Sequence, residues 1–93
     1  SWRAPAFRVY RHQTVWRNIT DSVDAIIGSS AYADNVNNGG DNSEGVGIFN
    51  IPSTKSFQLW HQSQVTYNIN GLGVSSAFGL TSIYSQVFIE KLN

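Results

Sequence analysis

Two histidines, His12 and His61, are the side chains of this sequence best suited to acid–base or metal chemistry. A metal site needs three or four converging ligands, and neither histidine belongs to a cluster with such spacing. Both fall in segments that alternate like β-strands, so we interpret each as a hydrogen-bonded structural residue. The absence of cysteine excludes disulfides and thiolate metal sites. We therefore predict no metal site and no cofactor.

The sequence contains no motif for nucleophilic catalysis and no pair of carboxylates suited to acid–base catalysis. No serine stands in a Gly-x-Ser-x-Gly turn. The six acidic residues are too few, and too often in predicted loops, to nominate an acid–base pair. The Gly71-x-Gly73 pair lacks the strand–helix setting of a phosphate-binding loop. We expect no catalytic residue and no enzymatic activity, so a small hydrolase is the function class with the least support.

Ligand binding is the chemistry that the polar loop at residues 34–44 could supply. Its Asp and Asn oxygens suit calcium, but Val36 stands where an EF-hand beginning at Asp34 would carry a ligand. A flexible, solvated loop is the interpretation that we favour. The side chains that we nominate for contact with a surface ligand are Tyr32, Asp34, Asn35, Asn37 and Asp41.

Aromatic rings could stack on sugars, and Trp2, Trp16, Trp60 and Tyr32 are the candidates. In a small β-domain, however, aromatic side chains are mostly found in the core or at an interface. The sequence leaves both interpretations open.

The sequence Asn18-Ile19-Thr20 fits the pattern of an N-glycosylation acceptor. We favour a turn between two strands, in which Asn18, Thr20 and Asp21 bond the local backbone.

These residues must be positioned by a chain of 93 residues, which is one domain with too little length for a second core. A chain of this size buries only about two-thirds of its unfolded surface. With disulfides and thiolate metal sites excluded, oligomerisation is the remaining source of stability.

Six Lys and Arg balance six Asp and Glu, which argues against a nucleic-acid partner. No apolar run approaches the ~20 residues of a membrane helix, and no signal-peptide pattern opens the chain, so we expect no membrane insertion.

Alternation of apolar and polar residues dominates the chain, and helix-period patterns are missing. It is clearest in residues 57–67, where Trp60 is the one large apolar residue on the polar face. Further strands are predicted at residues 6–16, with a bulge or bend near 11–13, and at 23–27, 46–51 and 83–92. Residues 34–44 and 68–81 read as loops, the second with apolar anchors that should pack onto the body. We expect at least six strands, no α-helix longer than two turns, and a β-sandwich or jelly roll.

The last predicted strand carries apolar residues on both faces. One face holds Ile83, Val87 and Ile89, and the other holds Tyr84, Phe88 and Leu92. Only one face can look into the core, so the other needs a neighbouring subunit or a loop of the same chain as its cover. We nominate Tyr84, Phe88 and Leu92 for an oligomer interface.

A series of short stretches spans nearly the whole chain. They are Ala-Pro-Ala-Phe-Arg-Val (residues 4–9), Arg-His-Gln (11–13), Asn-Ile-Thr-Asp (18–21), Ile-Gly-Ser-Ser-Ala-Tyr (27–32), Phe-Gln-Leu-Trp-His (57–61), Asn-Gly-Leu-Gly-Val (70–74) and Ile-Tyr-Ser-Gln-Val-Phe-Ile-Glu-Lys-Leu (83–92). In order and spacing, the series resembles a recurrent C-terminal module of phage tail-fibre, tail-spike and other virion proteins, also seen in large DNA viruses.

The resemblance implies a jelly-roll-like antiparallel β-sandwich, similar to complement and tumour-necrosis-factor heads, that forms a homotrimer at the tip of a fibre. It implies no catalytic residue. The function that we expect is a non-enzymatic virion module that binds a glycan or protein of the host surface, trimerises the fibre, or does both. The alternative is a capsid decoration or connector with a purely structural role. The expected partners are further copies of the chain, other virion proteins and the host surface, and the expected location is the virion.

Two departures from the resembling modules affect these expectations. Such modules commonly have a Gly/Thr-Tyr strand just upstream of the Ala-Pro segment, and this chain starts too late to include it. We expect either that the residues are a fragment of a longer chain or that a neighbour completes the sheet. In addition, Tyr10 stands where a small residue is common.

Overall fold

Six β-strands and no helix make up the part of the chain that the computed structural model describes, which is residues 1–34, 40–67, 70–74 and 77–91. The strands are β1 (Trp2–Ala4), β2 (Tyr10–Asn18), β3 (Val23–Ala33), β4 (Ser43–Gly45), β5 (Phe57–Ser63) and β6 (Gln86–Val87). The prediction of an all-β chain with at least six strands is confirmed. These ranges hold no helix that could cross a membrane.

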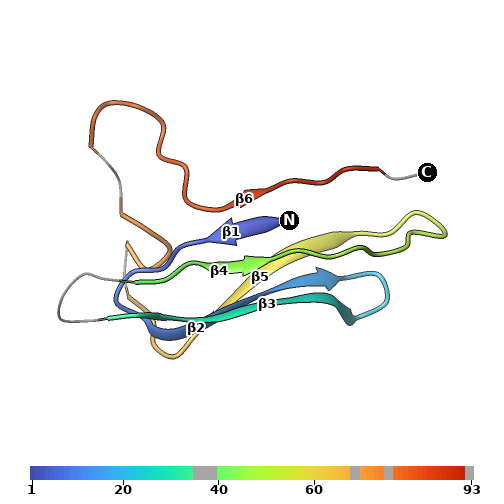
Figure 1. Ribbon diagram of the computed structural model, residues 1–93, viewed down its shortest axis with the longest axis horizontal. Coiled ribbons are helices and arrows are strands. Elements are labelled where there is room, and N and C mark those ends of the chain that lie inside the picture. Colours follow the sequence, from blue (N-terminus) through green and yellow to red (C-terminus); the bar gives the residue numbers. More distant parts are fainter. Residues whose placement is uncertain (35–39, 68–69, 75–76, 92–93) are drawn as a thin grey trace.

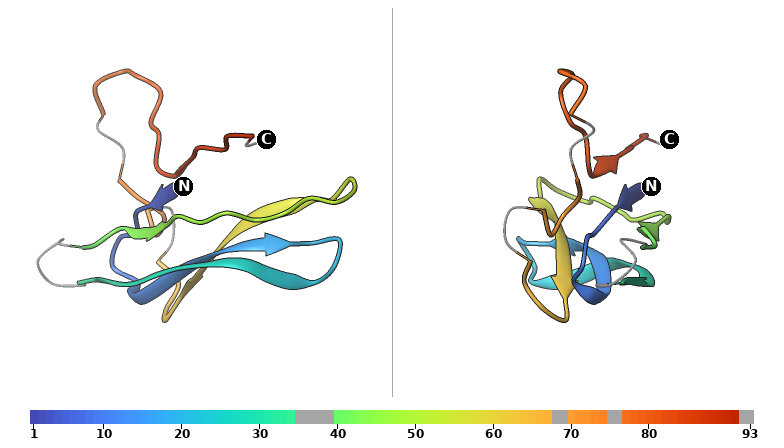
Figure 2. Two further views of the ribbon diagram at one scale, coloured as in Figure 1. Left: turned by 45° about the vertical axis from the view of Figure 1, so that its right-hand side comes forward. Right: turned by 90° about the vertical axis from the view of Figure 1, so that its left-hand side faces the viewer.

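The strands form two three-stranded sheets, one in the order β4-β1-β6 and the other in the order β3-β2-β5. Every paired strand runs antiparallel to its neighbour. Figures 1 and 2 show the two sheets as the two layers of a sandwich, with the longer strands in the β3-β2-β5 layer. The predicted antiparallel β-sandwich is confirmed.

The turn between β2 and β3 is fixed by the Asn18 side chain. Its Oδ1 accepts a hydrogen bond from the Asp21 backbone N–H at 3.0 Å, and its Nδ2 donates to the Asp21 carboxylate at 2.8 Å. The predicted bond to the local backbone is therefore confirmed for Asn18, whereas the Asp21 carboxylate bonds the side chains of Asn18 and Lys55. The prediction is wrong for Thr20, whose hydroxyl accepts from the Ser56 backbone N–H at 2.8 Å and so ties the turn to the start of β5.

A bulge interrupts the β2–β3 ladder, but it lies on the strand opposite the predicted one. Gln13 pairs with Ser30 and Val15 pairs with Ile27, so β3 carries the extra residue opposite Thr14. Gly28 permits the close approach, because a Cβ there would collide with the Thr14 hydroxyl and backbone. The prediction from the sequence of β2 placed the irregularity approximately, near residues 11–13, but put the extra residue on β2 when it lies on β3.

The alternation predicted for residues 57–67 is confirmed over residues 57–62 of β5, where the odd positions are half-buried and the even positions are exposed. The strand ends at Ser63, earlier than predicted.

Two predicted strands differ in extent from the structure. Residues 46–51 form no strand, and the pairing of β4 with β1 ends at Gly45 opposite Trp2. Within the predicted strand at 83–92, only β6 pairs with β1. The ladder extends by one pair, in which Ser1 and Phe88 exchange backbone hydrogen bonds of 2.7 and 2.8 Å.

The predicted packing of residues 68–81 onto the body is also wrong for much of the segment. Its start is held by the Phe7 N–H, which donates to the Gly71 carbonyl at 2.9 Å. Beyond that point Leu72, Val74 and Phe78 are 60%, 54% and 83% exposed. Residues 77–82 stand away from both sheets in Figures 1 and 2.

The centre of the sandwich is small and partly polar. Among the described residues the buried hydrophobic set is Trp2, Ala4, Val9 and Ala33, and the buried polar set is His12, Thr14 and Ser43. A half-buried aromatic cluster adjoins it, in which the Trp16 ring stacks on Phe57 at 5.6 Å and contacts Phe49 and Trp2 at 6.1 and 6.4 Å. No large aliphatic side chain lies fully buried among the described residues.

Candidate functional site

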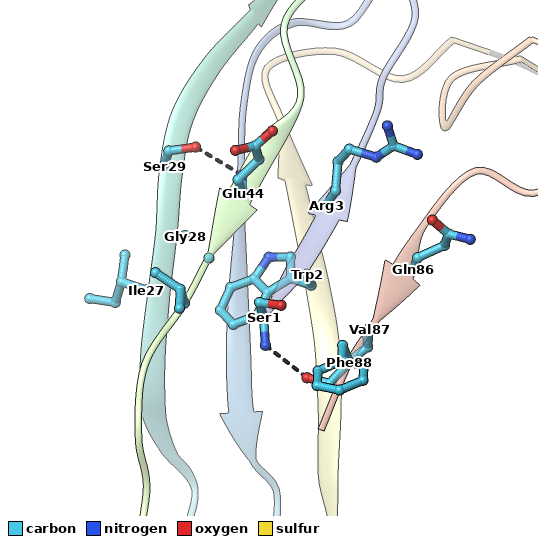
Figure 3. A pocket seen from close by; sticks show the side chains of 12 residues that line it. Ser1, Trp2, Arg3, Ile27, Gly28, Ser29, Glu44, Gln86, Val87 and Phe88 are labelled. Atoms are coloured by element: carbon cyan, nitrogen blue, oxygen red, sulfur yellow. Dashed lines mark hydrogen bonds between the residues drawn. The ribbon is translucent and has the colours of Figure 1, made fainter. Parts of the chain in front are cut away.

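An open groove of about 900 Å³ lies where the β4-β1-β6 sheet meets β3 (Figure 3). We call it the Trp2 groove, because the buried Trp2 indole lies at its centre. Its lining residues are Ser1, Trp2, Arg3, Ile27, Gly28, Ser29, Glu44, Gly45, Val46, Gln86, Val87 and Phe88. Four strands contribute to it, so its position depends on how the two sheets pack.

A chain of hydrogen bonds fixes the Trp2 ring. Trp2 Nε1 donates to the Thr14 hydroxyl at 2.6 Å. The Thr14 hydroxyl oxygen in turn lies 2.7 Å from the Ser43 hydroxyl oxygen. The Ser43 hydroxyl donates to the Ser29 carbonyl at 2.7 Å. Because the Ser43 hydroxyl donates its proton to that carbonyl, the Thr14 hydroxyl must be the donor in the bond between Thr14 and Ser43. All three hydrogen bonds therefore point the same way along the chain of groups. Such aligned bonds strengthen one another in a buried setting.

Glycine completes the seat of the indole. A Cβ atom at Gly45 would overlap the Trp2 ring, so only glycine lets β4 pass against it. The same ring is hydrogen-bonded through Thr14 to Ser43, two residues earlier on β4. The local sequence of β4, Ser-Glu-Gly, therefore supplies both the polar anchor and the space that Trp2 requires.

The mouth of the groove combines exposed apolar side chains with a charged row. Val46, Val87 and Phe88 are 80%, 42% and 66% exposed. Arg3 faces Glu44 on one neighbouring strand and Gln86 on the other, in register. An apolar strip beside a pair of opposite charges is suited to contact with another protein surface.

The structure separates the three residues nominated for the oligomer interface. Phe88 lines the Trp2 groove, whereas Tyr84 is half-buried and lines a second cavity of about 410 Å³ beside His61 and Tyr67. Leu92 lies outside the described residues. The prediction that Tyr84 and Phe88 share one face of a continuous strand is wrong, because only residues 86–87 are strand there.

Of the five residues nominated for ligand contact, Tyr32, Asp34 and Asp41 are described, and Asn35 and Asn37 lie outside the described residues. Tyr32 is 46% exposed at the end of β3, and its carbonyl accepts from the Asp41 N–H at 2.9 Å. The structure thus brings Tyr32 and Asp41 together. It also corrects part of the predicted loop, because Ser43 is fully buried in β4.

His12 and His61 meet across β2 and β5, with 2.8 Å between His12 Nδ1 and His61 Nε2. Burial lowers the pKa of His12, an effect that the backbone and charge of Asp41 partly oppose. Burial, followed by the nearby charge of His12, lowers the pKa of His61. The pair therefore favours the neutral state, with one ring donating to the other. No group of three or more His, Asp or Glu side chains in the described ranges is placed to hold a metal ion.

Sequence reasoning missed most of the Trp2 groove. Phe88 was nominated for an interface and Trp2 only for stacking on sugars, while Arg3 and Glu44 were not nominated, because strands distant in sequence bring these residues together. The usable signal was the apolar run at 46–51, whose exposed Val46 reaches the groove.

Comparison of the chain with protein-family models, curated proteins and solved structures found no match.

Proposed function

We propose that this chain is a non-enzymatic module of a virion surface protein, at the tip of a tail fibre or spike, that assembles with two further copies and binds the host surface. The resemblance of its ordered sequence stretches to tail-fibre and tail-spike modules supports the virion role and the threefold assembly. The structural support concerns assembly, and it comes from the surface of the chain.

The observation that carries the proposal is the amount of apolar surface left in water. Sixteen large hydrophobic side chains are exposed among the described residues, against four buried hydrophobic residues. Burying one such side chain is worth about 1.5–3 kcal/mol, and a domain has only ~5–15 kcal/mol of net stability. A chain with this distribution gains much of its stability from whatever covers the exposed set.

The total surface area gives the scale of that cover. The chain exposes 6673 Å², whereas a compact monomer of 10.3 kDa is expected to expose about 5,400 Å². Its radius of gyration is 14.6 Å, against about 12 Å for a compact domain of this length. The excess of roughly 1,300 Å² suffices for two contacts of about 650 Å² each. Each protomer of a closed trimer makes two contacts.

The Trp2 groove is the part of the surface that we assign to the contact between copies. Its apolar strip includes Phe88, which the sequence nominated, and Arg3 lies in register beside Glu44. A contact between copies would cover Phe88 and Val46 and leave the charged row at the rim, as in other protein interfaces.

Matched substitutions on neighbouring residues test the assembly. Phe88→Asp places a charge in the groove and is expected to convert the trimer into monomer or to unfold the chain. Val46→Asp, on the opposite wall, is expected to dissociate the trimer without unfolding it, because Val46 is 80% exposed in the single chain. Gln86→Asp, in the polar row beside Arg3, is the matched comparison and should change the mass much less than either apolar substitution. Light scattering after gel filtration measures the mass of all three variants in solution, and circular dichroism shows whether each is folded.

The groove assignment fails if Val46→Asp and Phe88→Asp both retain the wild-type mass. The capsid decoration or connector role makes the same prediction for self-assembly but no prediction of binding to a host surface. Binding of the assembled protein to host glycans or cells therefore separates the two roles.

A further inference from the structure

Trp60 lies on the polar outer face of the β3-β2-β5 sheet and is 41% exposed. The other outward positions of β5 are Gln58 and Gln62, both exposed, while Phe57, Leu59 and His61 turn inward and are half-buried. Trp60 is therefore the large apolar exception among the outward positions of β5, in the structure as well as in the sequence.

Neighbouring side chains hold the Trp60 ring in place. Its Nε1 donates to the Gln58 amide oxygen at 2.8 Å. The Arg17 guanidinium carbon lies 5.2 Å from the ring centre, and Arg17 in turn is paired with Asp24 at 2.7 Å. An exposed tryptophan fixed by these contacts has little rotamer freedom left to lose when a ligand covers it.

Three glutamine amides lie near this ring on the same face. Gln62 follows Trp60 by two residues on β5 and faces Gln13 of β2 across the ladder. The Gln13 amide nitrogen donates to the Gly28 carbonyl at 2.8 Å, which orients the group and leaves its oxygen and a second N–H for a ligand. Gln58 uses its oxygen on Trp60 and keeps its amide donors.

Charge and polarity select the class of ligand. The positive charge of Arg17 is offset by Asp24, so the surface around Trp60 is neutral and does not favour an anion. The same face also carries Val15, which pairs with Trp60, and the exposed Ile27, which pairs with Val15. A protein interface core is typically apolar throughout, whereas here one aromatic ring has glutamine amides beside it along β5. A pyranose has the complementary form, with an apolar C–H face for the ring and a rim of hydroxyls for the amides.

We propose that Trp60, with Gln58, Gln62, Gln13 and Arg17 around it, is a binding platform for a neutral pyranose glycan. The inference deepens the proposed function, on which it rests, by naming the ligand class and moving the site from the loop at 34–44 to the outer face of β5. It is independent of the Trp2 groove, which involves none of these residues.

The test uses the intact wild-type protein on an array of neutral hexose and N-acetylhexosamine oligosaccharides, with sialylated and sulfated counterparts as the acidic arm. We expect binding to neutral glycans without a gain from added acid groups. Titration of the best neutral oligosaccharide should quench or shift tryptophan fluorescence. Trp60→Ala should weaken binding on the order of tenfold or more, and Trp60→Phe should recover part of the affinity.

Phe78→Ala is the matched control, because Phe78 is 83% exposed on a different segment, and it should bind as the wild type does. The inference is overturned if the wild type binds no neutral glycan, or if Trp60→Ala keeps wild-type affinity. It is also overturned if Trp60→Ala dissociates the oligomer, since the face would then be a subunit contact. A trimer that binds no glycan would contradict this inference and leave the assembly proposal standing.

Discussion

His12 and His61 show how a titratable pair can be structural. Their rings share one hydrogen bond of 2.8 Å, and His12 is only 3% exposed. That bond requires at least one neutral ring, because two protonated rings would both be donors and would repel one another. The sequence predicted structural histidines but not that the two would be partners, since β2 and β5 become neighbours only in the folded sheet.

Acid should therefore destabilise the fold in a defined range of pH. Burial lowers the pKa of both histidines in the folded chain, while an unfolded histidine titrates near about 6.5. The unfolded state binds more protons below that value, so the free energy of unfolding should fall as the pH drops from about 6.5. The slope can reach about 1.4 kcal/mol per pH unit for each histidine. Chemical denaturation at a series of pH values measures it.

His61→Gln is the informative variant for this prediction, because it keeps a hydrogen-bonding group and removes one titration. The pH dependence between about 6.5 and 5 should become shallower than in the wild type. Hydrogen bonds from Lys55 and Asn18 lower the pKa of Asp21. Its titration therefore changes the stability only at more acidic pH, outside this range. An unchanged slope in His61→Gln would contradict the structural account of the pair.

At the scale of elements, β4 depends on one hydroxyl. The strand has three residues, and Ser43 bonds the Thr14 N–H at 2.9 Å as well as the Thr14 hydroxyl and the Ser29 carbonyl. The composition of residues 34–44 predicted a loop, since Ser, Asn, Asp and Gly usually mark turns. A buried serine has the same sequence signature as an exposed one, and for that reason β4 was missed.

Ser43→Ala should destabilise the chain by about 1–3 kcal/mol, because it leaves buried polar partners on β2 and β3 without their hydrogen bonds. Ser53→Ala, at an exposed position, is the control and should change the stability by less than about 0.5 kcal/mol. Thermal unfolding followed by circular dichroism compares the two variants. Equal midpoints would mean that the hydroxyl chain does not hold β4 in place.

Strand extent was the other element-level error, and its cause is physical. Residues 46–51 and 83–92 have the apolar content of strands, but a strand also needs a partner, which a local pattern does not report. Val46 lies beyond the last β1–β4 pair and Phe88 pairs with Ser1 beyond β6, and both side chains line the groove. The alternation in β5, by contrast, predicted its two faces correctly because both follow from local periodicity.

At the scale of the whole molecule, the fold class was predictable and the groove was not. Period-two alternation with frequent turns indicated a β-sandwich, and the structure confirms it. The thin core was also expected from a short chain without cysteine, and the exposed apolar set of the structure agrees with that expectation. The location of the groove required the packing of β3 against β1, β4 and β6, which no local pattern encodes.

The central claim is that copies of this chain cover one another's apolar surface, and the mass of the wild-type protein in solution tests it most directly. Sedimentation equilibrium at micromolar concentration should give three times the 10.3 kDa of the chain, or about 31 kDa. A well-folded species of 10.3 kDa under the same conditions would contradict the claim, because the exposed apolar side chains would then be stable in water.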